Sequence, residues 1–139
     1  MRILLLATLL AVPAAAQAPT VAPSKLGVFA GDWAAGEWKH TEYGATTSSQ
    51  RCVLRVEDMV LPAGADLNGC RVTVLENAES RGAFSYACPS GRLGRTDIRR
   101  DAQGVYVVAA QGIGADNLPF NMRGEFRRTG ACQAVAGTR

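Results

Sequence analysis

Four cysteines and a single histidine are the side chains of this 139-residue chain best suited to covalent or metal chemistry. The cysteines are Cys52, Cys70, Cys88 and Cys132, and they are too far apart to form the C-x-x-C pairs typical of zinc sites. Their number is even, and all of them follow an N-terminal segment with export character. We therefore expect two disulfide bonds and no metal site.

The segment from Cys70 to Cys88 predicts one of these bonds. It has two alternating apolar runs around a turn at residues 77–80, and folding it about residue 79 brings three pairs of side chains opposite one another on one face. The pairs are Cys70 with Cys88, Val72 with Tyr86, and Val74 with Phe84. Opposed residues of an antiparallel hairpin have Cα atoms about 4.5–5.5 Å apart, which a disulfide can span. We expect a Cys70–Cys88 bond.

That choice leaves Cys52 to pair with Cys132. The sequence leaves two other connectivities open, 52–70 with 88–132 and 52–88 with 70–132.

The remaining reactive side chains do not form a recognisable catalytic set. Hydrolysis needs a nucleophile held against a base, or a metal with an open position. The chain has no G-x-S-x-G motif, and its one histidine, His40, shares a strand face with Trp38 and Glu42. Glu57 and Asp58 are adjacent in a turn-like segment, which does not create opposed acid and base roles. We expect no enzymatic activity, no cofactor and no metal.

The N-terminus has the layout of a secretory signal peptide. Arg2 precedes an apolar run from Ile3 to Val12 and the small residues 14–16, with cleavage expected after Ala16 or Ala18. The run is about ten residues, half of the roughly twenty that span a bilayer, so no transmembrane anchor is expected. The expected organisation is a signal peptide at 1–16, an N-terminal arm at 17–30, a single all-β domain at 31–133 and a C-terminal tail at 134–139. These features predict a periplasmic or secreted protein.

The charge of the chain does not favour a nucleic-acid partner. The formal net charge is +3, and one of these charges, Arg2, leaves with the signal peptide. The arginines become denser toward the C-terminus, at Arg92, Arg95, Arg99, Arg100, Arg123, Arg127 and Arg128. Because acids are interspersed, we interpret them as a solvated strand face; a basic face on one sheet is the alternative.

Several short strands separated by turn residues are expected along the chain. They are residues 36–44, a strand around Cys52, the two halves of the 70–88 hairpin, a second hairpin at 92–112 with its turn at 101–104, and a last strand at 118–128. A short helical turn at 56–61 and a loop at 62–69 separate the second and third strands. The pattern predicts an all-β fold, an antiparallel meander forming a small barrel or a curved half-barrel.

In the order of its motifs, the chain resembles a family of exported bacterial proteins catalogued only as a domain of unknown function, number thirty-six seventeen. The motifs are the "G-x-W" at Gly36–Trp38, the Ser/Thr-rich "TTSSQRC" ending at Cys52, "CRVT" from Cys70, "CPSG" from Cys88 and a final glycine- and arginine-containing segment from Gly124 to Cys132. Ala35 replaces the usual proline before "G-x-W", the loop before Cys70 is short, and the final segment is one residue longer than in the family pattern. The resemblance implies export and a fold but no catalytic residue.

Together these features favour a non-catalytic binding or structural module of the cell envelope. One alternative is a lipocalin-like carrier of a small apolar ligand, with an interior lined by Trp38, Val72, Val74, Phe84, Tyr86, Val107 and Phe120. Another is an inhibitor or partner of an exported hydrolase, because small exported inhibitors of metalloproteases also begin with "G-x-W". In that case the apolar part of the arm, Leu26, Val28 and Phe29, could insert into a partner. We expect it to pack over the open end of the domain.

Overall fold

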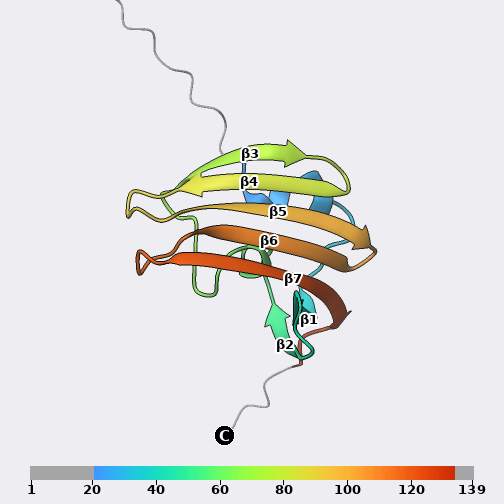
Figure 1. The fold of residues 1–139 in the computed structure, drawn as a ribbon. Helices are drawn as coiled ribbons and strands as arrows, with labels where there is room; N and C mark the ends of the chain where they lie inside the picture. The colour runs from blue at the N-terminus through green and yellow to red at the C-terminus, as the bar shows by residue number, and fades with distance from the viewer. Residues whose placement is uncertain (1–20, 134–139) are drawn as a thin grey trace, which may run out of the picture.

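A single curved antiparallel sheet contains all the strands of the computed structural model, which describes residues 21–133 (Figure 1). Its seven strands lie in the order β2-β1-β7-β6-β5-β4-β3. Their bounds are β1 Gly36–Glu42, β2 Ser48–Val53, β3 Arg71–Asn77, β4 Arg81–Ala87, β5 Leu93–Ala102, β6 Val105–Ile113 and β7 Pro119–Gly130. The all-β antiparallel prediction is confirmed.

The sheet is an open half-barrel, one of the two forms that the sequence predicted. Strands β3 to β7 form a meander, and β1 then pairs with β7, with Glu42 opposite Gly124. The edge strands β2 and β3 are consecutive along the chain but lie at opposite edges of the sheet. Seventeen residues, 54–70, cross between them and cover the concave face instead of closing a barrel.

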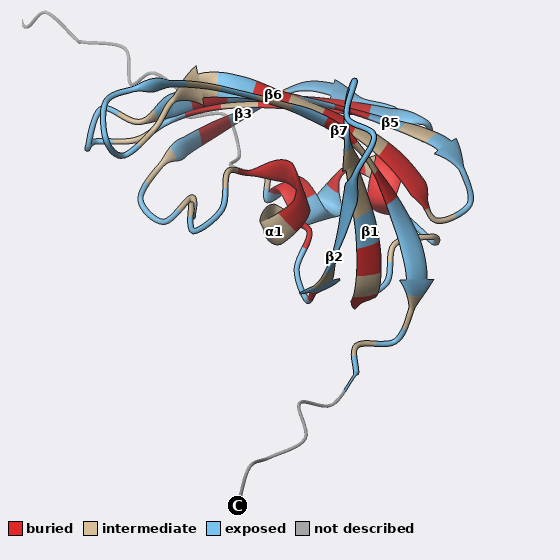
Figure 2. Ribbon diagram, turned by 60° about the horizontal axis from the view of Figure 1, so that its bottom comes forward, coloured by how far each residue is buried: buried red, intermediate tan, exposed pale blue. Residues whose placement is uncertain are grey.

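Three short helices fill the hollow of the sheet (Figure 2). They are the 3-10 helices η1 Pro23–Lys25 and η2 Gly27–Phe29 and the α-helix α1 Glu57–Val60. Met59 and Val60 of α1 are buried against the sheet, and Thr96 of β5 donates its hydroxyl to the Val60 carbonyl at 3.0 Å. The hydrophobic core therefore lies between the concave face and these helices.

The β3–β4 hairpin has the register that the sequence predicted. Val72 lies opposite Tyr86 and Val74 opposite Phe84, with a bulge between Val74 and Glu76. A disulfide joins Cys70 to Cys88, whose Cα atoms are 4.1 Å apart. A second disulfide joins Cys52 to Cys132 across 80 residues of sequence. Both expected pairings are confirmed.

The N-terminal arm packs into the core along its described part. Leu26 and Val28 are fully buried and contact Gly82, where an added Cβ would lie 2.9 Å from Val28 Cγ1. Asn77 Oδ1 accepts the Gly27 N–H at 2.6 Å, which fixes the arm to the end of β3. The arm is therefore packed against the sheet, as we expected, and its apolar residues are not free to insert into a partner. The predicted signal peptide and C-terminal tail lie outside the described residues.

Candidate functional site

Aromatic side chains fill the concave interior, where a carrier would hold its ligand. Trp38, Phe84, Tyr106 and Phe126 have no exposed surface, and Phe29 stacks at a tilt on Tyr106 with ring centroids 5.3 Å apart. Such packing is typical of small β-domains, whose own side chains occupy the interior. Burial raises the pKa of Tyr106 to about 12, and the nearby Asp32 carboxylate adds to the shift.

Most of the predicted lining residues belong to this packed core. Trp38, Val72, Phe84 and Tyr86 are buried, Val74 is half-buried against them, and half-buried Phe120 lines a recess of about 110 Å³ with Tyr86. The prediction that Val107 lines the interior is wrong, because Val107 lies on the convex face, opposite Arg99 and Glu125. The apolar run Val105–Ala110 does not alternate, so its sequence could not show which members face the core. Tyr106, Val108 and Ala110 do, and Val105 at the start of the strand is buried as well.

His40 lies in a structural cluster rather than in an acid–base site. Its ring stacks on Phe126 with centroids 4.4 Å apart, and the Arg51 guanidinium lies over the same Phe126 ring at 5.4 Å. Gly124 leaves the space that the imidazole Nε2 occupies. Burial lowers the pKa of His40, and the Arg51 charge lowers it further. This arrangement gives His40 a role in aromatic packing against Phe126.

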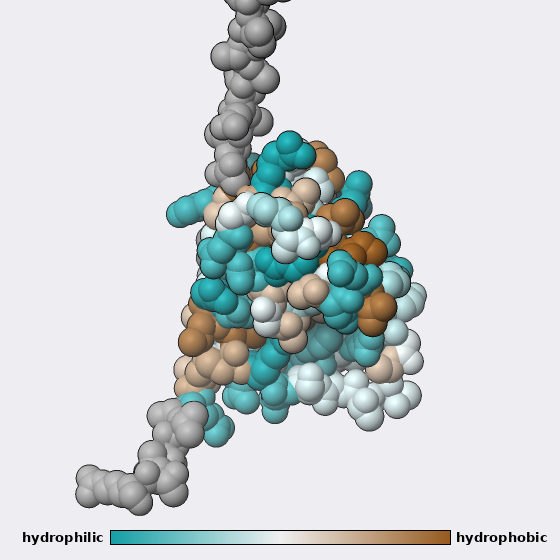
Figure 3. Space-filling view, turned by 90° about the vertical axis from the view of Figure 1, so that its left-hand side faces the viewer, coloured by the Kyte–Doolittle hydropathy of each residue, from teal (hydrophilic) through white to brown (hydrophobic). Residues whose placement is uncertain are grey.

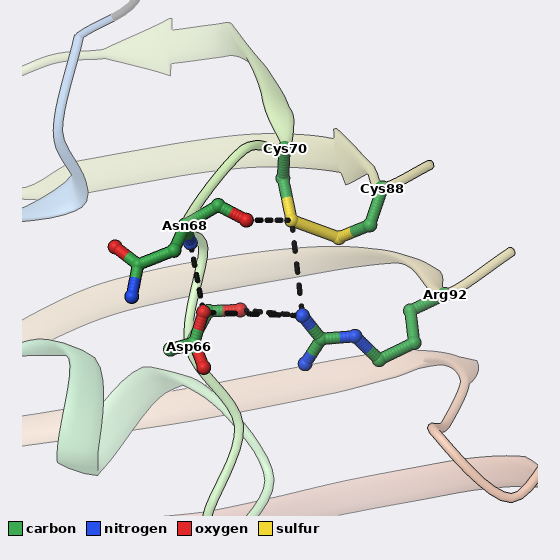
Figure 4. A network of polar contacts seen from close by, with 5 residues as sticks. All are labelled: Asp66, Asn68, Cys70, Cys88 and Arg92. Carbon is green, nitrogen blue, oxygen red and sulfur yellow. Dashed lines mark hydrogen bonds and ion pairs between the residues drawn. A yellow bond between two sulfur atoms is a disulfide. The ribbon is translucent and has the colours of Figure 1, made fainter. Parts of the chain in front are cut away.

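The loop before β3 is tied to the Cys70–Cys88 disulfide by Arg92 (Figure 4). Arg92 donates to the Asp66 carbonyl at 3.1 Å and lies 3.9 Å from Cys70 Sγ, while Asp66 Oδ1 accepts the Asn68 N–H. Beside this network is an open recess of about 300 Å³. It is lined by Val21, Ala22, Pro23, Arg55, Glu57, Asp66, Leu67, Asn68, Cys70 and Val72. Glu57 and Asp58, which are adjacent in sequence, do not form an acid–base pair, because Asp58 forms an ion pair with Arg55 at 2.7 Å.

The convex face carries charged side chains that pair along single strands. Arg95 and Asp97 of β5 form an ion pair at 2.7 Å, and Arg99 pairs with Asp101 farther along β5. On β7, Arg127 pairs with Glu125 at 3.2 Å. For Arg95, Arg99 and Arg127 this confirms the solvated strand face with interspersed acids. Exposed ion pairs of this kind contribute little to the free energy of unfolding, so the fold does not depend on them. Of the other predicted arginines, Arg100 is half-buried and pairs with Asp32 at 2.9 Å, and Arg92 binds the loop before β3.

One end of the convex face is apolar. Leu93, Ile113 and Pro119 lie opposite one another across β5, β6 and β7 and form the apolar row. A shallow depression of about 520 Å³ lies along the apolar row, bordered by Arg95, Gln111 and Asn121. Figure 3, which views the molecule from this end, shows hydrophobic side chains gathered among polar ones. Leu93 is 49% exposed, and Leu118 beside the row is 61% exposed.

Sequence reasoning did not identify the apolar row. Its members belong to three strands, and each one alone resembles the scattered apolar residues of an ordinary surface. The only sequence signal for the row was the apolar pair Leu118 and Pro119, at the turn that joins β6 to β7.

No family model, no curated protein and no solved structure matches this chain. The resemblance of its motifs to a family of unknown function therefore stays a prediction. Within residues 21–133, no helix has both the length and the apolar character needed to span a membrane.

Proposed function

We propose that this protein is an exported, disulfide-bonded module of the cell envelope that works by binding another protein, without catalysis. The observation that carries the proposal is the combination of a filled interior with the exposed apolar row on the convex face. Exposed apolar patches on small domains are commonly interaction sites. The two disulfides support export, because such bonds persist in oxidising compartments. We place the protein in the periplasm or the extracellular medium.

The border of the apolar row indicates the chemistry of the partner. Gln111 and Asn121 are neutral amides, and the charge of Arg95 is balanced by Asp97. A partner that presented an unpaired charge here would lose hydration without gaining an opposite charge. The surface therefore fits a neutral protein loop with a projecting apolar side chain, surrounded by backbone groups that the amides can bind. An exported hydrolase with such a loop is one partner of this kind.

The carrier alternative rests on the recess beside Val72. This recess is open to solvent and is bordered by Arg55, Glu57 and Asp66, so an apolar ligand there would contact charged groups. We therefore favour the convex face as the binding surface.

Site-specific photocrosslinking in the producing cell tests the proposal. A photoreactive residue at 93 or 113 should crosslink the same single protein, and one at Leu75 should not. Leu75 is a matched control, because it is 48% exposed but lies on the edge strand β3, outside the depression along the apolar row. With the purified partner, Leu93→Asp should weaken binding by about tenfold or more, as for a residue central to an interface. Products shared with position 75, a product with the mass of two copies of this chain, or no product at 93 and 113 would overturn the proposal.

A further inference from the structure

Arg123 is held on the convex face by an aromatic ring rather than by an acid. Its guanidinium lies over the Tyr43 ring, 4.4 Å from the centroid. The backbone fixes this arrangement, because the Tyr43 N–H donates to the Arg123 carbonyl at 2.8 Å just beyond the β1–β7 ladder. Tyr43 is 74% exposed, so the stack lies at the surface.

Most of the arginines near Arg123 are already paired with acids. Arg95, Arg99 and Arg127 each have an acid on their own strand, whereas Arg81, which lies opposite Arg99, has none among the ion pairs of residues 21–133. Among residues 21–133, no carboxylate lies within 4.0 Å of the Arg123 guanidinium. Its N–H donors therefore remain available for a planar acceptor, which arginine binds through two parallel hydrogen bonds.

Two depressions of the surface adjoin at this residue. One, of about 180 Å³, extends toward Glu76 and Arg81, and the other, of about 370 Å³, extends toward the β1–β2 turn. Both are lined by Arg99, Val107 and Arg123, and we call their combined surface the convex trough. Val107 supplies an apolar patch in the trough between the charged side chains.

The lining of the larger depression indicates which anion fits. It includes the carboxylates of Asp101 and Glu125, which are paired with Arg99 and Arg127, and the guanidinium of Arg123, which has no acid partner among residues 21–133. A phosphate dianion placed here would bring two negative charges to one unpaired guanidinium and would lie beside both carboxylates. A monoanion that also carries hydroxyl groups meets no such penalty, because its hydroxyls can donate to the same carboxylates.

We propose that Arg123 binds the carboxylate of a polyhydroxylated ligand in the convex trough, with the chemistry of a sugar acid. Tyr43 orients the guanidinium, and the acids of the larger depression accept hydrogen bonds from the ligand's hydroxyls. This site is separate from the apolar row, so it would bind its ligand whether or not a protein docks there.

Titration of the isotope-labelled mature protein, followed by NMR, tests the site with three probes at matched ionic strength. D-galacturonate should cause saturable shifts of the amides of Tyr43, Val107 and Arg123. D-galactose has the same ring but no carboxylate, and inorganic phosphate has no hydroxylated ring; neither should cause these shifts. Equal shifts with galactose or phosphate, or no shifts with galacturonate, would overturn the proposal.

Variants then locate the anchor. Arg123→Gln should weaken galacturonate binding by about tenfold or more, because a charge-assisted bidentate contact is lost. Tyr43→Ala should weaken it by about two- to fivefold through loss of the cation–π contact. Arg127→Gln, an exposed arginine of the same strand that is paired with Glu125, should change it by less than about twofold. An equal loss in Arg127→Gln and Arg123→Gln would show general charge attraction instead of a site. Leu93→Asp should leave galacturonate binding unchanged, which separates this result from the test of the apolar row.

Discussion

Gly124 of β7 lies beneath the imidazole of His40, and this position has no room for a side chain. An added Cβ would lie 2.8 Å from the Thr41 carbonyl oxygen and would also clash with His40 Nε2. We expect Gly124→Ala to lower the free energy of unfolding by about 1–3 kcal/mol, as overpacking does in a well-packed core. Urea denaturation measures this change. Gly130→Ala near the end of the same strand is the control, since no atom lies within 4 Å of its added Cβ. Equal losses in the two variants would contradict this steric explanation.

His40 should make stability depend on pH near neutrality. Burial and the Arg51 charge lower its pKa in the folded protein, while Glu42 opposes this shift more weakly. In the unfolded chain the pKa returns to about 6.5. The unfolded state therefore binds a proton first as the pH falls. The stabilising contribution is complete above the unfolded pKa, decreases as the pH falls below it, and is fully lost below the folded pKa.

His40→Phe removes this titration and keeps an aromatic ring against Phe126. We expect the free energy of unfolding of the original protein to decrease between pH 8 and pH 5 relative to that of this variant. Urea denaturation at several pH values provides the comparison. Parallel pH profiles for the two proteins would show that His40 does not contribute.

At the scale of the elements, the two disulfides close loops of very different length. The Cys70–Cys88 bond spans 18 residues of sequence and the Cys52–Cys132 bond spans 80. The loss of unfolded-state entropy corresponds to about 3 kcal/mol for the shorter loop and about 4.5 kcal/mol for the longer one. Replacing Cys52 and Cys132 by Ala should therefore destabilise the protein more than replacing Cys70 and Cys88. Urea denaturation of the two double variants compares them, and the reverse order would show that native-state contacts around Cys70 outweigh loop length.

The N-terminal arm should stabilise the sheet that it covers. Leu26 is buried over Gly82 of β4, so Leu26→Ala leaves a cavity at the interface between the arm and the sheet. A loss of about 2–5 kcal/mol is expected in thermal or urea unfolding, as for other buried leucines. Lys25→Ala, on the exposed side of the arm, is the control and should change stability by less than about 0.5 kcal/mol. A loss below about 1 kcal/mol in Leu26→Ala would show that the arm packs only loosely.

The elements differ in how far their sequence determined them. The β3–β4 hairpin could be predicted with its register, because Val72, Val74, Phe84 and Tyr86 alternate between two cysteines. The pairing of β1 with β7 could not, since it joins residues about 90 apart and no local pattern encodes a contact of that range. The stack of Tyr43 on Arg123 depends on this pairing, and so it too was not visible in the sequence.

At the scale of the whole molecule, the open sheet decides where a ligand can bind. Strands β2 and β3 do not meet, and α1 with the two 3-10 helices occupies the space that a closed barrel would enclose. The core is thus a packed layer between the sheet and its own chain (Figure 2). The convex face is left as the larger regular surface of residues 21–133, and both proposed binding sites lie on it.

This architecture predicts that the isolated protein holds no small apolar molecule in its interior. Native mass spectrometry of the mature protein, isolated from an oxidising compartment, should give a mass four hydrogens below that of the reduced chain, because two disulfides are present. Denaturation without reductant should leave this mass unchanged, since Trp38, Phe84, Tyr106 and Phe126 already fill the interior. An apolar adduct that is present in the native spectrum and absent after denaturation would contradict the filled core and favour a carrier. Val72→Asp changes the lining of the recess beside the arm. If such an adduct were retained in this variant, that recess would be excluded as its binding site.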